Sequence, residues 1–178
     1  MKVIQISVQG FDNNFSYLLV GEKGEAILID PAGSIKEIEK AAAENNVKII
    51  FQLVTHAHFD HTQNVSYFLK KGIPLKSFEE LKREPVFFAA GIKIETLFLP
   101  GHTSDSVCFL VCNNLFTGDV LFADGIGRTD LGGDEKLMRA SLEKLSALSK
   151  NNSEIIIWPG HNYGGASSTL KDALEKLL

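Results

Sequence analysis

The chain has few of the features that mark a membrane, secreted or nucleic-acid-binding protein. Only two of its 178 residues are cysteines, and no stretch approaches the roughly 20 apolar residues that a membrane-spanning helix needs. The first ten residues alternate polar and apolar side chains, without the continuous apolar run and small-residue cleavage site of a secretory signal. We therefore expect a cytoplasmic protein with no membrane partner.

Clustered positive charge is also missing. Lysine and arginine total 18 against 22 acidic residues, which gives a formal net charge of −4, and no segment concentrates the basic residues. Because a phosphate backbone is attracted by such clusters, we expect no nucleic-acid partner. The hydrophobic share of 44% is ordinary for a globular protein, and no linker or low-complexity tract divides the chain. Residues 1–178 are thus predicted to be a single domain.

The two cysteines, Cys108 and Cys112, lie in one apolar run. If this run is a strand, the two residues stand about 13 Å apart, at about 3.3 Å per residue, which is too far for a disulfide. The same spacing puts both thiols on one face of the strand. They are predicted to be small buried hydrophobic side chains rather than metal ligands, since no other cysteine or histidine is close in sequence.

Strands and helices alternate irregularly along the chain. Short apolar or alternating runs bounded by turn residues predict strands at 3–8, 15–20, 26–29, 48–54, 86–89, 92–99, 107–111, 115–117 and 155–158. Helical spacing of apolar residues predicts helices at 35–45, 62–71, 78–84, 135–150 and 168–178. Ser34 is expected to cap the first helix, with Glu37 at the reach-back position. The leucines of the last helix can pack on the domain or on another copy of the chain, which leaves a homo-oligomer open.

Several strands connect as hairpins, whereas others are separated by helices. This pattern is neither the regular alternation of a parallel α/β fold nor that of an all-β chain. Two sheets packed face to face, with helices outside, would satisfy it.

All five histidines follow apolar runs and stand beside turn residues. A first group of metal-ligand types follows the run at 49–54 and comprises His56, His58, Asp60 and His61. His102 and His161 each complete a Pro-Gly-His tripeptide. Imidazole nitrogens and carboxylate oxygens suit a borderline cation such as zinc or ferrous iron. Such clustering favours a metal site over five separate structural histidines.

One more carboxylate, Asp119, follows a short apolar run and a glycine. Gly-Asp alone is only a turn signal. Together with five histidines, Asp119 would supply the negative charge that two divalent ions need between them.

Taken in order, these motifs resemble the metallo-β-lactamase-fold hydrolases, closest to the branch of glyoxalase II (hydroxyacylglutathione hydrolase) and persulfide dioxygenase. The signature His-x-His-x-Asp-His stands at residues 56–61, and further matches lie at 100–103, 118–119, 121–130 and 159–161. The resemblance implies an α/β (α+β) fold, a four-layer αββα sandwich with the metals at one edge of the two sheets. It also implies a short form without the C-terminal helical domain of full-length glyoxalase II.

The resemblance further implies two divalent metal ions, zinc or else iron or manganese. It assigns the first ion to His56, His58 and His102, and the second to Asp60, His61 and His161. Asp119 would bridge the two ions.

Three more residues match family positions around the metals. Asp30 would orient a metal ligand without binding the metal itself, although it can also be a turn residue before Pro31. Arg128 and Tyr163 match contacts to the glutathione part of a substrate. A surface salt bridge and a packed aromatic ring are the respective alternatives.

The implied activity is hydrolysis of a thioester, such as an S-acyl-glutathione, by a metal-bridged hydroxide. Asp60 would be the catalytic residue that orients the nucleophile, and a thiolate leaving group needs little help from an acid. One alternative is a persulfide dioxygenase with a single iron on His56, His102 and Asp119. Another is a non-catalytic metal-binding module, against which the complete ligand set argues.

Overall fold

The chain forms two compact units, Met1–Ile94 and Glu95–Leu178. The computed structural model describes residues 1–8 and 11–177. The division falls inside one strand, β6 (Ile92–Phe98). The single domain predicted for residues 1–178 stays a prediction.

The N-terminal unit is built on a four-stranded sheet in the order β1-β2-β3-β4. Its strands are β1 (Lys2–Ser7), β2 (Phe15–Val20), β3 (Glu25–Ile29) and β4 (Lys48–Leu53). Two short 3-10 turns, η1 (Phe11–Asn13) and η2 (Glu22–Gly24), precede β2 and β3. β1, β2 and β3 are antiparallel, whereas β4 lies parallel to β3. The predicted strands are confirmed, with differences only at their ends.

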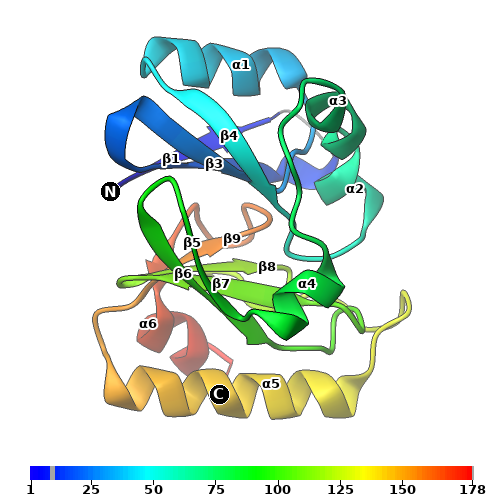
Figure 1. The fold of residues 1–178 in the computed structure, drawn as a ribbon. Coiled ribbons are helices and arrows are strands. Elements are labelled where there is room, and N and C mark those ends of the chain that lie inside the picture. Colours follow the sequence, from blue (N-terminus) through cyan, green and yellow to red (C-terminus); the bar gives the residue numbers. More distant parts are fainter. Residues whose placement is uncertain (9–10, 178) are drawn as a thin grey trace. The chain divides into compact units, whose positions relative to one another are not determined.

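Helix α1 (Ile35–Glu44) covers one face of this sheet (Figure 1). The Ser34 side chain caps it by accepting the Glu37 amide, as the sequence predicts. Ile38 and Ala42 are buried among apolar side chains of the sheet. Burying one such aliphatic side chain contributes about 1.5–3 kcal/mol. This packing holds together the strands from which the first histidine motif emerges.

The helix predicted at 62–71 is wrong in its start and its continuity. The chain instead forms α2 (Phe59–Thr62) and α3 (Val65–Lys70), separated at Asn64. The Asn64 side chain donates to the Gly33 carbonyl at 2.9 Å, and its amide donates to the Pro31 carbonyl. These tertiary bonds draw the backbone out of the helix. Asp60 and His61 of the histidine motif lie in α2, a helical turn rather than the predicted loop.

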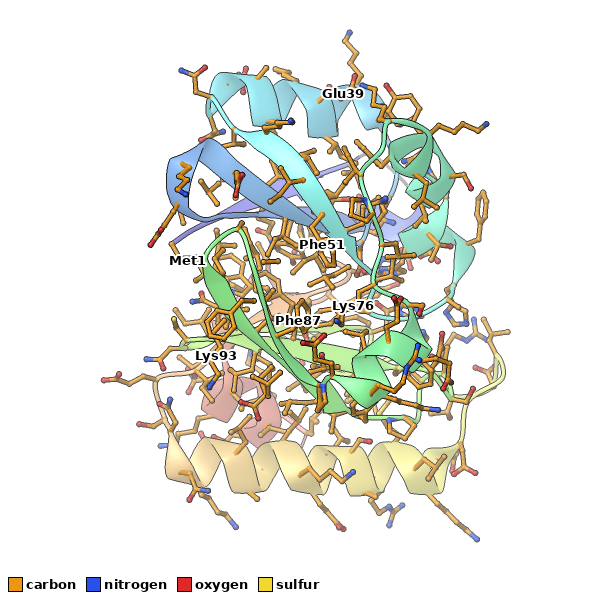
Figure 2. The ribbon with its side chains drawn as sticks, in the orientation of Figure 1. Met1, Glu39, Phe51, Lys76, Phe87 and Lys93 are labelled. Carbon is orange, nitrogen blue, oxygen red and sulfur yellow. The ribbon has the colours of Figure 1, made fainter. Side chains whose placement is uncertain are left out.

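The predicted helical turn at 78–84 is confirmed as α4 (Phe78–Arg83), with a capping box between Ser77 and Glu80. Strand β5 (Val86–Ala89) follows it. The Phe87 ring lies 6.3 Å from that of Phe51 on β4, and the Lys76 ammonium lies 4.6 Å from the Phe87 ring centre (Figure 2). These contacts anchor β5 within the N-terminal unit.

The second sheet has the order β10-β9-β8-β7-β6-β5. Its further strands are β7 (Val107–Val111), β8 (Asn114–Gly118), β9 (Ile156–Pro159) and β10 (Ser168–Thr169). Neighbouring strands from β6 to β8 are antiparallel, β8 and β9 are parallel, and β10 is antiparallel to β9.

Helices α5 (Glu135–Asn151) and α6 (Leu170–Glu175) pack against the sheet of the C-terminal unit (Figure 1). Met138 and Leu145 of α5 share a buried cluster with Leu115 and Ile157 of the strands. Asp134 caps α5 by accepting the amides of its first turn. Among the helices that the structure describes, none is long and apolar enough to cross a membrane.

The helix predicted at 168–178 starts later than expected. Residues 168 and 169 form the short strand β10, and Thr169 then caps α6 by accepting the Asp172 amide. Leu170 is fully buried and Leu174 packs on the same cluster, so these leucines contact the body of the unit. Leu178, also placed on this face, lies outside the described residues.

The prediction for the cysteines is right for one and wrong for the other. Cys108 is buried in β7, whereas Cys112 is exposed, and both are free thiols. β7 ends at Val111, and Cys112 takes a left-handed backbone conformation (φ 52°) in the turn to β8. The alternation of a strand therefore does not extend to Cys112.

Candidate metal centre

Two parallel strands bring the first motif and Asp30 to one edge of the N-terminal sheet. Ile29, the last residue of β3, is paired with Leu53, the last residue of β4. Because parallel strands end at the same edge, Asp30 and His56 emerge side by side. Both are buried, with exposed fractions of 1% and 2%.

The Asp30 carboxylate contacts two residues of the motif region. Its Oδ1 accepts the Thr55 amide at 2.7 Å, and its Oδ2 accepts the Thr55 hydroxyl at 2.8 Å. The same Oδ2 lies 3.1 Å from Nδ1 of His61. A carboxylate only accepts hydrogen bonds, so Nδ1 of His61 carries the proton. Asp30 thereby orients the His61 ring.

The backbone of Asp30 is itself held in place. It has a left-handed conformation (φ 50°), which aspartate tolerates better than most residues. Its carbonyl accepts the Ser16 hydroxyl and the Ala32 amide, and the Ala32 amide also donates to Ser16 Oγ. Hydrogen bonds at the Asp30 carbonyl and at its carboxylate thus fix both the backbone and the side chain.

The three imidazoles of the motif lie against one another. The ring centres of His56 and His58 are 4.7 Å apart, and those of His56 and His61 are 4.3 Å apart. Asp60 Oδ2 lies 3.5 Å from Nε2 of His61, while Asn14 donates to the Asp60 carbonyl at 2.6 Å. Because Nδ1 of His61 donates to Asp30, Nε2 is the ring nitrogen that faces the Asp60 carboxylate, and both are metal-ligand atoms. A cation stabilises such an arrangement.

In the C-terminal unit, three strands that run in the same direction present the remaining candidate ligands. β6 and β8 are both antiparallel to β7, and β9 is parallel to β8. The ends of β6, β8 and β9 therefore lie at one edge of the sheet, where they are followed by His102, Asp119 and His161. All three side chains are largely buried.

His102 is held by main-chain atoms. Its Nδ1 lies 2.7 Å from the Arg128 carbonyl, which can only accept, so Nδ1 is protonated. The Gly127 amide donates to the Asp119 carbonyl at 2.9 Å. A Cβ at Gly127 would lie 2.0 Å from that carbonyl oxygen and 2.8 Å from His102 Nδ1. Only glycine fits this close approach.

Asp119 lies between the two histidines of this unit. Its Oδ2 is 3.5 Å from Nε2 of His102 and 3.4 Å from Nε2 of His161. Since Nδ1 of His102 donates to the Arg128 carbonyl, Nε2 is the ring nitrogen that faces the carboxylate. The C-terminal unit repeats the pairing that His61 and Asp60 show in the N-terminal unit.

The two predicted substrate contacts occupy different surroundings. The exposed Arg128 guanidinium forms two hydrogen bonds to Asp130, which lower the pKa of that carboxyl to about 2. The surface salt bridge that the sequence leaves open is thus present. Tyr163 is 39% exposed, and its ring centre lies 5.6 Å from that of His161 and 4.8 Å from that of Phe122. The predicted substrate contacts of Arg128 and Tyr163 stay predictions.

The donor set suits divalent metal ions. Buried imidazoles with a fixed Nδ1 proton and nearby carboxylates are the ligands of zinc and iron sites, and outer hydrogen bonds of this kind orient them. The candidates that can bind metal are His56, His58, Asp60 and His61 in the first unit, and His102, Asp119 and His161 in the second. Which ion each residue binds stays a prediction.

Three supporting residues escaped the sequence analysis. Thr55, Ser16 and Asn14 are buried polar residues around Asp30 and the motif. Thr55 adjoins His56, Asn14 immediately precedes β2, and Ser16 lies in β2, the strand that pairs with β3. Polar residues inside apolar strands that border a metal motif are the signal that could have identified them, because a buried hydroxyl or amide needs a partner.

Comparisons with known proteins agree with this geometry. The model of the metallo-beta-lactamase superfamily matches residues 9–85 and 73–161. The hydroxyacylglutathione hydrolase of Dictyostelium discoideum is 32% identical over 92% of this chain, which spans 66% of that relative. The probable polyketide biosynthesis zinc-dependent hydrolase BaeB of Bacillus velezensis is 28% identical over 92% of this chain and 80% of its own length.

Among solved structures, the BLEG-1 B3 metallo-beta-lactamase superposes with a TM-score of 0.85. It is 25% identical, and the match covers 98% of this chain and 97% of the other. The predicted metallo-β-lactamase fold, an α+β fold with two mixed sheets, is confirmed. The resemblance drawn from the motifs is confirmed as well.

Proposed function

We propose that this chain, which belongs to the metallo-beta-lactamase superfamily, is a metal-dependent hydrolase that cleaves a thioester of the S-acyl-glutathione class. The relatives reported above are described as hydrolases. The finer assignment, to thioesters, draws on the relative described as a hydroxyacylglutathione hydrolase.

One observation carries the proposal of a metal enzyme. In both units an imidazole whose Nδ1 proton is held by an acceptor turns its Nε2 toward a carboxylate oxygen at 3.5 Å. A ring nitrogen and a carboxylate oxygen are both ligand atoms of divalent metals, and a cation between them would stabilise the pair.

We assign two divalent ions to this ligand set. The first would be held by His56, His58 and His102, the second by Asp60, His61 and His161, with Asp119 shared. We propose zinc, because one relative is described as zinc-dependent. When bound, such ions lower the pKa of a water molecule toward neutrality and polarise a carbonyl oxygen.

The protein's own groups would orient the reactants. The Asp60 carboxylate is 25% exposed, so it can accept a hydrogen bond from a nucleophilic water and take up its proton. Asn14 holds the Asp60 backbone and so limits its movement. A thiolate is a good leaving group, and a thioester therefore needs no further acid from the chain.

For the thiol part of the substrate we propose the region around Arg128. Arg128 borders a cavity of about 450 Å³ with Met138, Arg139 and Leu142. Its guanidinium would bind a substrate carboxylate only by exchanging Asp130 for it. Tyr163, beside His161, would contact the same substrate through its exposed ring edge.

The test measures metal content and thioester turnover on the same purified sample. Elemental analysis gives the number of zinc, iron and manganese ions per chain, and S-lactoylglutathione hydrolysis gives kcat/KM. We expect about two ions and turnover that a chelator abolishes and zinc restores. An S-acyl-N-acetylcysteamine of the same acyl group serves as the control for the glutathione part.

Two outcomes would reject the proposal. One iron per chain, no thioester turnover and oxygen consumption with glutathione persulfide would identify the dioxygenase alternative. Full metal loading without turnover of any thioester or lactone would identify a non-catalytic metal-binding module.

A further inference from the structure

We propose that Thr55 is a positioning residue that fixes the tautomer of His56 and so makes its Nε2 available to a metal. The inference rests on the proposed function only in taking His56 as a metal ligand. Thr55, His56 and Asp30 all lie in the N-terminal unit.

The Thr55 hydroxyl has a single proton and can donate it to only one of its two neighbours. Oγ1 of Thr55 lies 2.8 Å from Oδ2 of Asp30 and 3.1 Å from Nδ1 of His56. An ionised carboxylate has no proton to give, so the hydroxyl must donate to Asp30. With that proton used, Oγ1 can only accept from His56. Nδ1 of His56 therefore carries a hydrogen.

The second step concerns the orientation of Thr55. Oδ1 of Asp30 accepts the Thr55 amide at 2.7 Å, so the same residue is bound through both its backbone and its side chain. Thr55 is 2% exposed, and little water can replace its hydroxyl. The hydroxyl is thus held with its lone pair toward the His56 ring.

The third step is the consequence for the imidazole. A neutral imidazole has one proton, and with this proton on Nδ1 the lone pair is on Nε2. Asp30 thereby acts on two histidines, directly on His61 and through Thr55 on His56. The Thr55 hydroxyl thus links the Asp30 carboxylate to the His56 ring.

The chain contains an internal reference for this effect. His102 has the same tautomer for a different reason, because its Nδ1 donates to the main-chain carbonyl of Arg128. A substitution at Thr55 should change His56 and leave His102 as it is.

The experiment is a long-range ¹H–¹⁵N correlation spectrum of the histidine rings, recorded for the full chain without metal at alkaline pH and again with zinc. Wild-type His56 is expected as the Nδ1–H tautomer in both spectra. Finding His56 as the Nε2–H tautomer in the metal-free protein would overturn the proposal without the need for any variant.

Two variants then separate the hydroxyl from the shape of the side chain. Thr55→Val keeps the shape and removes the hydroxyl, whereas Thr55→Ser keeps the hydroxyl. We expect Thr55→Val to shift His56 toward Nε2–H and to weaken zinc binding by about 10–100-fold, the usual effect of losing such a partner. Thr55→Ser should keep the wild-type tautomer of His56 and the wild-type zinc affinity.

An unchanged His56 tautomer and zinc affinity in folded Thr55→Val would contradict the proposal. If Thr55→Val does not fold, the wild-type tautomer and the behaviour of Thr55→Ser still decide it. Failure of the proposed function looks different, since wild-type protein without thioester turnover would leave the tautomer of His56 and its response to Thr55 unaffected.

Discussion

The two units support their histidines by different means. In the N-terminal unit, His61 is oriented by the Asp30 carboxylate, and His56 contacts the Thr55 hydroxyl. In the C-terminal unit, His102 is oriented by the carbonyl of Arg128. A side-chain acceptor can be removed by one substitution, whereas a carbonyl can be moved only by displacing the backbone. The first kind of support depends on residue identity, and the second depends on close packing.

The largest expected effect comes from removing the side-chain support. In Asp30→Asn the amide nitrogen cannot accept. At the Oδ1 position it leaves the Thr55 amide without its acceptor, and at the Oδ2 position it leaves both the Thr55 hydroxyl and His61 without theirs. We expect zinc affinity to fall by about 10–100-fold and the free energy of unfolding to fall by about 1–3 kcal/mol. Zinc titration and thermal denaturation measure the two effects. The exposed Asp172→Asn is the matched control, and equal affinities of the two variants would refute the role of Asp30.

A smaller effect is expected when the backbone support is displaced. In Gly127→Ala the new Cβ would lie 2.0 Å from the Asp119 carbonyl oxygen, so the segment that carries the Arg128 carbonyl must shift. We expect zinc affinity to fall by about tenfold, at the lower end of the usual range for outer partners.

Gly125→Ala is the control for Gly127→Ala. Gly125 has φ 118°, and a Cβ there meets no atom within 4 Å, so its substitution adds backbone strain without a clash. It should lower the melting temperature but keep the zinc affinity. If both variants bind zinc as the wild type does, close packing at Gly127 does not support His102.

The contrast also explains what the sequence could predict. Side chains that bind metal are chemically distinctive, so all five histidines and Asp119 could be named from their types and spacing. Ser34 was found as a cap because capping is a local effect. The acceptor for His102 could not be found, because every residue has a carbonyl and only the fold determines which one lies nearby.

Errors in the predicted elements have the same origin. Asn64 interrupts the helix through bonds to residues about thirty positions earlier, which helical periodicity does not register. Cys112 looks like a strand residue until the turn at the end of β7 is known. Local patterns thus predicted the elements, and contacts distant in sequence decided where they end.

A third variant distinguishes the role of the Arg128 side chain from that of its main-chain carbonyl. Arg128→Ala removes an exposed ion pair but keeps the main-chain oxygen that His102 contacts. Zinc affinity should therefore match that of the wild type, and the melting temperature should change by no more than about 1 °C. Calorimetric zinc titration checks the first point. A large loss of affinity would show that the guanidinium supports the site.

The smallest effect concerns pH. Hydrogen bonds from Arg128 lower the pKa of Asp130 from 3.8 to about 2. Since the pKa is lowered on folding, the contribution of this pair is complete above pH 3.8 and is lost as the pH falls toward 2. The pair should add no pH dependence to stability near neutrality. An NMR titration of the Asp130 carboxyl checks the value, and Arg128→Ala should return it toward 3.8.

The left-handed backbone at Asp30 has a consequence for how this sequence can diverge. The conformation favours glycine, asparagine and aspartate, and of these only aspartate offers acceptors on both side-chain oxygens. The left-handed backbone and the need for two acceptor oxygens therefore both select aspartate. Any single replacement of it fails at least one of these requirements. Position 128 is under no such double demand, because any residue supplies a carbonyl. For the support of the histidines alone, substitution is thus blocked at position 30 and tolerated at position 128.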